Sequence, residues 1–323
     1  MKSFKLPLIS FVGVALFGLF ADFALDAYIQ LLILYSMVNI LLAMSLNFVS
    51  GYTGQFSLGH AGFMSVGAYF SAYASMHWQI FPESLGFLNF FFYTLGAGLT
   101  AAFAGFLVGQ PSLRLKGDYL AIVTLGFGEI IRVAILNIDS LGAARGIAGI
   151  PSMGSYLKNY SFGGFWIVVC FFTMWRLLNS RHGRAFLSVR EDEIAAESMG
   201  INTTQMKVKA FILSSFFAGI AGALFAHYIN FINPQRFDFQ QSVAVVIMVV
   251  LGGLGSMSGS ICAAIFVTVL PELLRPLQEI TGVDLRMVIY SLILIIVMLI
   301  RPQGLLGGKE LNQVWRKYVK RAS

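Results

Sequence analysis

Residues 28–48 read YIQLLILYSMVNILLAMSLNF and contain no Asp, Glu, Lys or Arg over 21 positions. A helix that spans the hydrocarbon core of about 30 Å needs about 20 mostly apolar residues, because its backbone hydrogen bonds must close within the segment. The stretch therefore predicts a membrane-spanning helix. A β-barrel would instead show segments of about ten residues that alternate between apolar and polar. The sequence thus favours an all-α fold.

Comparable stretches recur along the chain, which is 57% hydrophobic and 11% charged, whereas soluble domains carry about 25% charged residues. No charged or Pro/Ser-rich linker divides it. We expect one polytopic transmembrane helical bundle over residues 1–323, with about ten membrane segments. The first has the charge-then-apolar form of a signal peptide, so cleavage near Ala21 or Ala24 is an alternative. The segments are placed at 7–25, 28–48, 61–77, 88–110, 119–137, 162–178, 208–229, 241–254, 259–271 and 286–300.

The formal net charge of +7 is unevenly distributed. Sixteen of the 22 Lys and Arg fall in four regions, which are residues 2–5, 114–116, 176–209 and 301–321. Cytoplasmic loops of membrane proteins carry an excess of Lys and Arg, and ten crossings from a cytoplasmic N-terminus put all four regions on that side. The pattern predicts that both termini are cytoplasmic and that the chain's surroundings are a lipid membrane, with no nucleic acid as partner.

Two glycine-rich stretches interrupt the apolar pattern, GYTGQFSLGH at 51–60 and GGLGSMSGS at 252–260. Irregular backbone at membrane depth survives only where protein buries it or a watery cavity faces it, and Gly-broken helices point to a transport site. Tight turns and close helix contacts are the alternative use of such glycines. The candidates for a translocation path in or beside the breaks are Asn47, Gly51, Tyr52, Gly54, Gln55, Ser57, Gly59, His60, Gly252, Gly253 and Gly255.

The segment 119–137 contributes further candidates. Glu129 and Arg132 lie three positions apart on one helical face, so they can pair and reduce a cost of about 2.5–3.5 kcal/mol per charge at the bilayer centre. We predict one neutralised unit, which serves the path or orients the helix. Thr124 in the same segment and Asn39 in the segment 28–48 are polar candidates that could instead form helix-to-helix hydrogen bonds.

The long loop at 180–207, predicted to be cytoplasmic, has the pattern of a short capped helix. Ser188 and Glu191 have the spacing of a capping box, Gly200 suits the position after the helix end, and Asn202 suits the start of the next membrane helix. Such a helix could transmit a partner's motion to the membrane segments, or be only a solvated surface helix. The residues of this candidate coupling loop are Gly183, Arg184, Arg190, Glu191, Asp192, Glu193, Ala195, Ala196 and Gly200.

No catalytic constellation is visible in the sequence. The four histidines are scattered, and no G-x-x-x-x-G-K-[ST] phosphate loop is present. We expect a transport subunit rather than an enzyme, with no cofactor and no metal. If transport uses ATP, another polypeptide must bind it.

Four stretches resemble the permeases of bacterial ATP-binding-cassette importers for branched-chain amino acids. They are residues 45–63, 113–132, 183–200 and 250–259, and the second, LRLKGDYLAIVTLGFGEIIR, resembles the M-type of two paralogous permeases. The resemblance implies an inner-membrane permease subunit that moves Leu, Ile or Val inward. It also implies a second paralogous permease subunit, two cytoplasmic ATPase subunits and a periplasmic substrate-binding protein as partners.

The resemblance has two departures, of which one is Leu141-Gly142-Ala143 in place of a family-like Thr-Gly-Gly, and it leaves two alternatives open. The family's ATPase-docking loop resembles Glu-Ala-Ala-x-x-x-Gly, of which Ala195, Ala196 and Gly200 match, whereas Ile194 stands in place of the Glu. Related permeases for urea or short amides share the same pattern. A stand-alone secondary carrier would need coupling-ion carboxylates in several segments, and only Glu129 lies deep in one.

Overall fold

The computed structural model describes residues 25–79, 81–82, 85–113, 115, 117–275, 286–301 and 303–307. The predicted segment 7–25, apart from its last residue, lies outside the described residues. So do the charged residues of the N-terminus, Arg114, Lys116 and the tail beyond 307.

The regular secondary structure of the described residues is helical apart from one pair of two-residue strands, so the all-α prediction is confirmed. The helices are α2 (Ala27–Tyr52), α3 (His60–His77), α4 (Gly86–Ser112), α5 (Asp118–Leu136), α6 (Tyr156–Leu178), α7 (Arg181–Glu191), α8 (Glu193–Ser198), α9 (Thr203–Ile229), α10 (Phe239–Gly252), α11 (Met257–Leu273) and α13 (Arg286–Ile300). Three 3-10 turns are η2 (Asp139–Leu141), η3 (Ala143–Arg145) and η4 (Pro234–Arg236). Strand β1 (Ile147–Ala148) pairs antiparallel with β2 (Phe231–Ile232).

Each predicted segment from 28–48 onward falls on one helix. Within the described residues, five helices are long and apolar enough to cross a membrane, namely α2, α4, α5, α6 and α9, while α11 and the end of α13 are shorter apolar helices. Local caps extend two helices beyond the predicted start. Ser155 accepts a hydrogen bond from the Lys158 amide at the start of α6, and Asn202 accepts one from the Gln205 amide at the start of α9. The prediction for Asn202 is thus confirmed.

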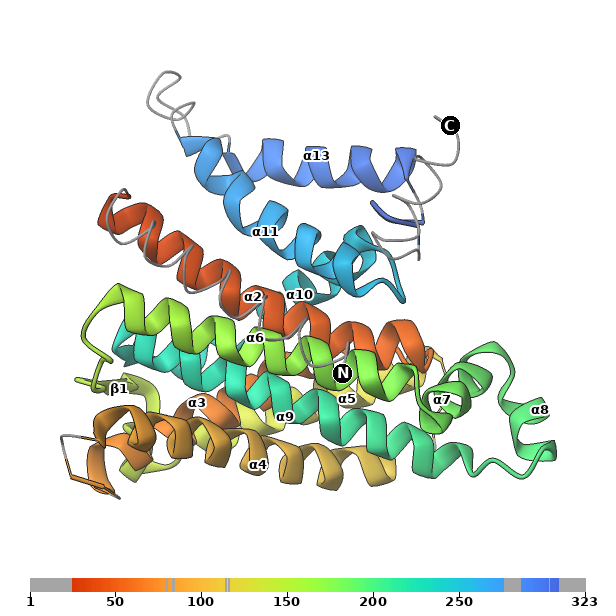
Figure 1. Ribbon diagram of the computed structural model, residues 1–323, viewed down its shortest axis with the longest axis horizontal. Coiled ribbons are helices and arrows are strands. Elements are labelled where there is room, and N and C mark those ends of the chain that lie inside the picture. The colour runs from red at the N-terminus through yellow and green to blue at the C-terminus, as the bar shows by residue number, and fades with distance from the viewer. Residues whose placement is uncertain are drawn as a thin grey trace, which may run out of the picture.

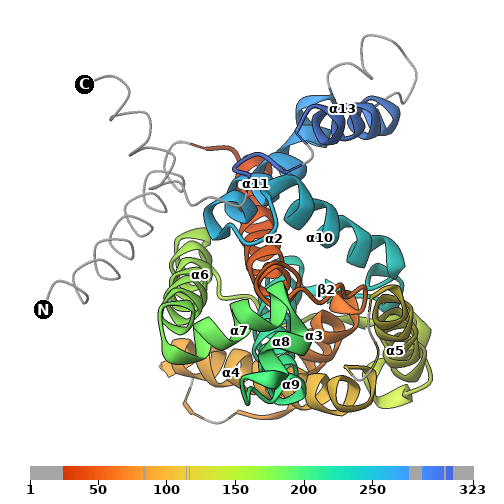
Figure 2. The same cartoon turned by 90° about the vertical axis from the view of Figure 1, so that its right-hand side faces the viewer.

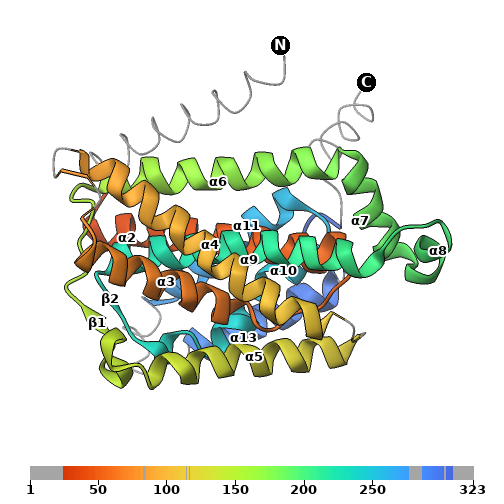
Figure 3. The same cartoon turned by 90° about the horizontal axis from the view of Figure 1, so that it is seen from below.

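Helix α2 lies inside the bundle. It packs against α9, α11, α6 and α10, and Figure 2 shows it surrounded by them. Four successive residues, Leu41 to Met44, are fully buried, which requires protein on every side of the helix. Figure 3 shows α5 along one edge of the bundle and α6 along the opposite edge, with α4 crossing between them.

The two ends of the bundle differ. In Figure 1, α7 and α8 project beyond one end, where α2 and α6 finish and α9 starts, and β1 lies at the other. We call these the loop end and the ladder end. Inside the bundle, Gly67 in α3 meets Gly219 in α9 so closely that a Cβ added at Gly67 would lie 2.2 Å from the Gly219 carbonyl oxygen. Small residues thus allow the close helix approach typical of membrane bundles.

Candidate functional site

The two glycine breaks meet at the loop end. A Cβ added at Gly51 would lie 2.1 Å from the Asn47 side-chain oxygen and 2.3 Å from the Gly255 amide nitrogen. The Asn47 amide group donates to the Ser256 carbonyl oxygen and accepts from the Gly255 amide, each at 2.9 Å. Side-chain and backbone contacts thus join α2 to the turn between α10 and α11. We call Asn47, Gly51 and Gly255 the glycine junction.

A residue of the coupling loop reaches this junction. Arg190, near the end of α7, donates from its guanidinium to the Gly51 carbonyl oxygen at 2.9 Å. Its side chain also covers Gly54 and Gly255, where an added Cβ would lie 3.2 Å and 3.1 Å from it. Both glycines have positive φ, +70° and +82°, so the turns that fit Arg190 are ones that other residues rarely adopt. Sequence reasoning named all four residues but gave no sign that they meet.

The part of the first break that lies between α2 and α3, residues 53–59, is held against α5. The Thr124 hydroxyl accepts a hydrogen bond from the Leu58 amide at 3.1 Å. A Cβ at Gly59 would lie 2.4 Å from the Thr124 carbonyl oxygen. His60 begins α3 and forms a buried hydrogen bond of 2.7 Å with the Ser45 hydroxyl.

The other path candidates are mostly buried. Both amide atoms of Gln55 are buried without a hydrogen-bond partner among the described residues. The remaining members of the breaks are Tyr52, Ser57, Gly252 and Gly253. All four are buried in the packing, and Gly253 takes a φ of +104°. Within the described ranges, no three His, Cys, Asp or Glu side chains gather as a possible metal site.

Glu129 and Arg132 form the predicted pair. The closest nitrogen and oxygen lie 2.7 Å apart, and the side chains are 33% and 25% exposed, respectively. Both side chains are partly exposed because α5 runs along an edge of the bundle. The prediction of one ion-paired unit is confirmed.

The coupling loop contains two helices, not one. Ser180 caps α7 by accepting from the Gly183 amide, and Asp192 caps α8 by accepting from the Ile194 and Ala195 amides. The predicted capping box was wrong: Ser188 lies inside α7 and its hydroxyl donates to the Ala185 carbonyl oxygen. The box spacing misled because Asp192, with a charged acceptor, is an equally good cap four residues later. Gly200 follows α8 with a φ of +81°, as predicted.

Helix α8 is clamped to α9. Lys207, almost fully buried in the first turns of α9, pairs with Glu193 at 2.6 Å, and the Thr203 hydroxyl donates to Glu197 at the same distance. Ala196 is buried, whereas Arg184 and Ala195 are exposed. Two large apolar side chains face outward here, Ile194 at 73% and Met199 at 82% exposure.

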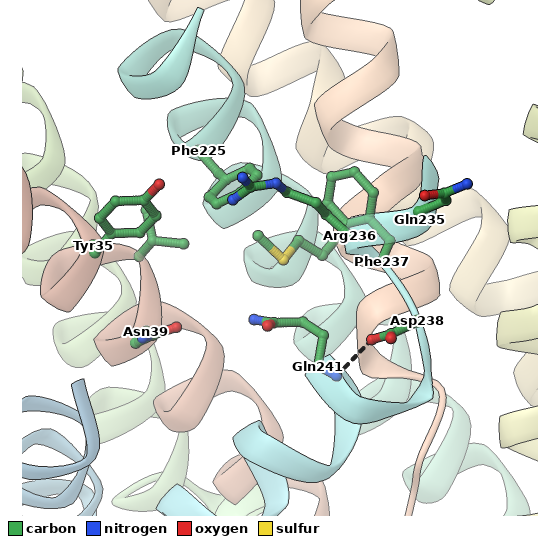
Figure 4. A pocket seen from close by; sticks show the side chains of 10 residues that line it. Tyr35, Asn39, Phe225, Gln235, Arg236, Phe237, Asp238 and Gln241 are labelled. Atoms are coloured by element: carbon green, nitrogen blue, oxygen red, sulfur yellow. Dashed lines mark hydrogen bonds between the residues drawn. The ribbon is translucent and has the colours of Figure 1, made fainter. Parts of the chain in front are cut away.

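Two cavities accompany these elements. One of about 210 Å³ lies at the loop end, between the first break and the coupling loop, and is lined by Gln55, Arg190 and Lys207. A larger one, of about 300 Å³, lies between α2, α3, α9, η4 and α10. Figure 4 shows Arg236 and Gln241 reaching into it and Asn39 facing them from α2. We call this the central pocket.

Sequence reasoning missed the central pocket except for Asn39. Arg236 and Asp238 lie between two apolar segments, where charge is expected in any loop, so nothing in the sequence set them apart. A signal was available in the shortness of the segment that follows, because α10 has only 14 residues. A helix of that length is about 21 Å long and cannot span the hydrocarbon core.

The sequence matches the family described as branched-chain amino acid transport system, permease component, over residues 28–298. The chain belongs to this permease family. It is thus a transmembrane transport protein, and the resemblance drawn from the four sequence stretches is confirmed.

Individual members of the family differ in their similarity to the chain. The high-affinity branched-chain amino acid permease LivM of Escherichia coli is 38% identical over 302 residues, covering 84% of this chain and 68% of the relative. LivH of the same organism is 24% identical over 290 residues, covering 85% and 92%. The autoinducer 2 import permease LsrC of Salmonella paratyphi B is 27% identical over 165 residues, covering 45% and 48%. No solved structure matches the chain.

Proposed function

We propose that this permease is one membrane subunit of an ATP-driven importer that moves branched-chain amino acids into a bacterial cell. Membership of the family and the identity to LivM support the substrate class. The similarity to both LivM and LivH supports a second permease as partner. Two cytoplasmic ATPases and a periplasmic binding protein complete the proposed assembly. We place the chain in the inner membrane as a single domain of about ten spans, with the loop end and both termini in the cytoplasm.

The connection from the coupling loop to the glycine junction carries the proposal. Closure of two ATPases can do work on the membrane helices only through a rigid contact that links them. The Lys207–Glu193 pair fixes α8 to α9, and Arg190 joins α7 to Gly51. A push on α8 is thereby transmitted to the place where both broken helices meet. Ile194 and Met199 supply the exposed apolar surface on which an ATPase would dock.

Uptake by cells tests the substrate. Deleting the gene in a strain without other branched-chain amino acid importers should abolish uptake of labelled leucine, isoleucine and valine, and the gene on a plasmid should restore it. Urea uptake should stay unchanged. Loss of urea uptake with normal leucine uptake would assign the chain to the amide-transporting alternative.

Two substitutions separate docking from coupling. Ile194→Asp should abolish co-purification of the ATPases, since it places a charge in an apolar contact, whereas the matched Ile194→Val should retain it. Arg190→Gln should keep the ATPases bound and hydrolysing ATP, yet lower leucine uptake at least about tenfold, because charge-assisted hydrogen bonds are the strong ones in such a link. Normal uptake by Arg190→Gln would show that the coupling force takes another route.

A further inference from the structure

The central pocket lies at membrane depth. Asn39, in its wall, is about 18 Å along α2 from Gly51, at 1.5 Å per residue. Helix α10 ends at Gly252, beside the junction, and its 14 residues place Phe239 about 20 Å from that end. Both estimates put the pocket well inside a core of about 30 Å. The segment 233–238 therefore returns from the ladder end into the bundle before α10 begins.

Two opposite charges accompany this segment into the membrane. Arg236 is exposed, and within the described part of the chain no carboxylate pairs with its guanidinium. Asp238 is half-buried and caps α10, because its Oδ1 accepts a hydrogen bond from the backbone amide of Gln241 at 3.0 Å. Ionisable groups at this depth are costly and are kept where they face a pathway or a partner charge. A small cleft that shares Phe237 and Asp238 also touches Glu129, whose charge Arg132 already neutralises.

The rest of the pocket is divided between amide groups and apolar wall. Asn39 donates to the Thr268 hydroxyl at 2.8 Å, which leaves its side-chain oxygen as an acceptor, and Figure 4 shows Gln241 across from it. Val38, Met64 and Phe225 form the apolar side. A volume of about 300 Å³ is at the lower limit for small-molecule sites, so it suits a ligand of few atoms.

We propose that the central pocket is a binding site, on the translocation path, for the zwitterion of an aliphatic α-amino acid. Arg236 takes the carboxylate and Asp238 the ammonium group, with the amides of Asn39 and Gln241 beside them, while the aliphatic side chain lies against the apolar wall. The inference rests on the proposed function, since it supplies the site at which an imported amino acid crosses mid-membrane. A neutral amide would leave both charges without partners, which disfavours urea as the ligand.

Protection of a cysteine tests occupancy of the pocket directly. The experiment uses the full transporter with its partner subunits. Two substitutions are made in the permease: Gln235→Cys places a thiol at the pocket rim, and Cys262→Ala removes an exposed thiol. Leucine should slow labelling of the new cysteine by a thiol reagent. Leucinamide, which lacks the carboxylate, and 4-methylpentanoate, which lacks the ammonium group, should each need at least about tenfold higher concentrations, as expected for a lost charged hydrogen bond.

Matched variants assign the two charges. Arg236→Gln should raise the leucine concentration for half-protection about tenfold or more and leave that for leucinamide unchanged. Asp238→Asn keeps the helix cap, because Asn caps as well as Asp. It should likewise raise the leucine concentration for half-protection about tenfold or more, and leave the half-protecting concentration of 4-methylpentanoate unchanged. Arg145 is an exposed arginine on the neighbouring turn η3. Arg145→Gln should leave the half-protecting concentrations of all three compounds unchanged.

The possible failures are distinct. The same full transporter is reconstituted in proteoliposomes to measure leucine uptake. If it takes up leucine, but leucine does not protect the cysteine or protects both charge variants as well as the protein without those changes, the pocket proposal is overturned and the proposed function stands. If leucine protects in the expected charge-dependent way without any uptake, the site stands and the proposed function fails.

Discussion

The two glycine breaks are built differently, although they meet at one junction. The second, 253–256, is short and is closed by its own cap, in which Ser256 accepts from the Gly259 amide, and by both hydrogen bonds of Asn47. The first, 53–59, is longer, leaves the side-chain amide of Gln55 unpartnered among the described residues, and donates one hydrogen bond, from the Leu58 amide, to the Thr124 hydroxyl. It is also the break that lines the loop-end cavity. The second break is therefore a fixed turn, and the first is the one with room to rearrange.

The largest loss of stability should follow from Gly51→Ala, because it affects both breaks. The added Cβ displaces Asn47 and the Gly255 backbone together, so the expected cost is at least about 3 kcal/mol, at the upper end of overpacking effects. Thermal unfolding of the purified protein in detergent measures it. Gly126→Ala is the matched control, since Gly126 also lies in a helix but has open space at its Cβ position. Equal midpoints for the two variants would show that the junction is not tightly packed.

Asn47→Ala should have the next largest effect and tests the second break alone. It leaves the Gly255 amide without a partner and removes one of the hydrogen bonds to the Ser256 carbonyl, which Ser260 still donates to. The expected cost is about 2–3 kcal/mol. The same unfolding measurement applies, with Asn137→Ala as control, because the Asn137 side chain bonds only to its own helix at an exposed end. Similar losses in both variants would contradict the view that Asn47 holds the turn.

Thr124→Val should have the smallest effect, on the first break. It replaces the hydroxyl by a methyl group and leaves the Leu58 amide unbonded, at an expected cost of about 1 kcal/mol. Thr100→Val is the matched control for the hydrogen bond that a threonine hydroxyl makes within its own helix, since Thr100 donates only to carbonyls of its own helix. If Thr124→Val costs more than Asn47→Ala, the first break is the more tightly held of the two and the assignment of the flexible break reverses.

Much of the fold could be predicted because its signals are local. Apolar stretches of helical length, the caps at Asn202 and Gly200, and the three-residue spacing of Glu129 and Arg132 each depend on residues within one or two turns. The false capping box at Ser188 shows the limit of such signals, since two acceptable caps stand close together and packing selects between them. Here the burial of Phe186 and Val189 against the bundle keeps Ser188 inside α7.

The sequence by itself determined that the chain enters a membrane as helices and that two of the helix connections are glycine-rich breaks. It also determined the family to which the chain belongs. These properties could be predicted because hydrophobicity and backbone freedom belong to single residues and short segments. Only the tertiary structure decided that Gly51 touches Gly255, that Arg190 reaches them from the coupling loop, and that Arg236 and Asp238 accompany η4 into the bundle. These contacts join residues far apart along the chain. Their existence depends on how the helices pack around α2, and no local pattern carries that information.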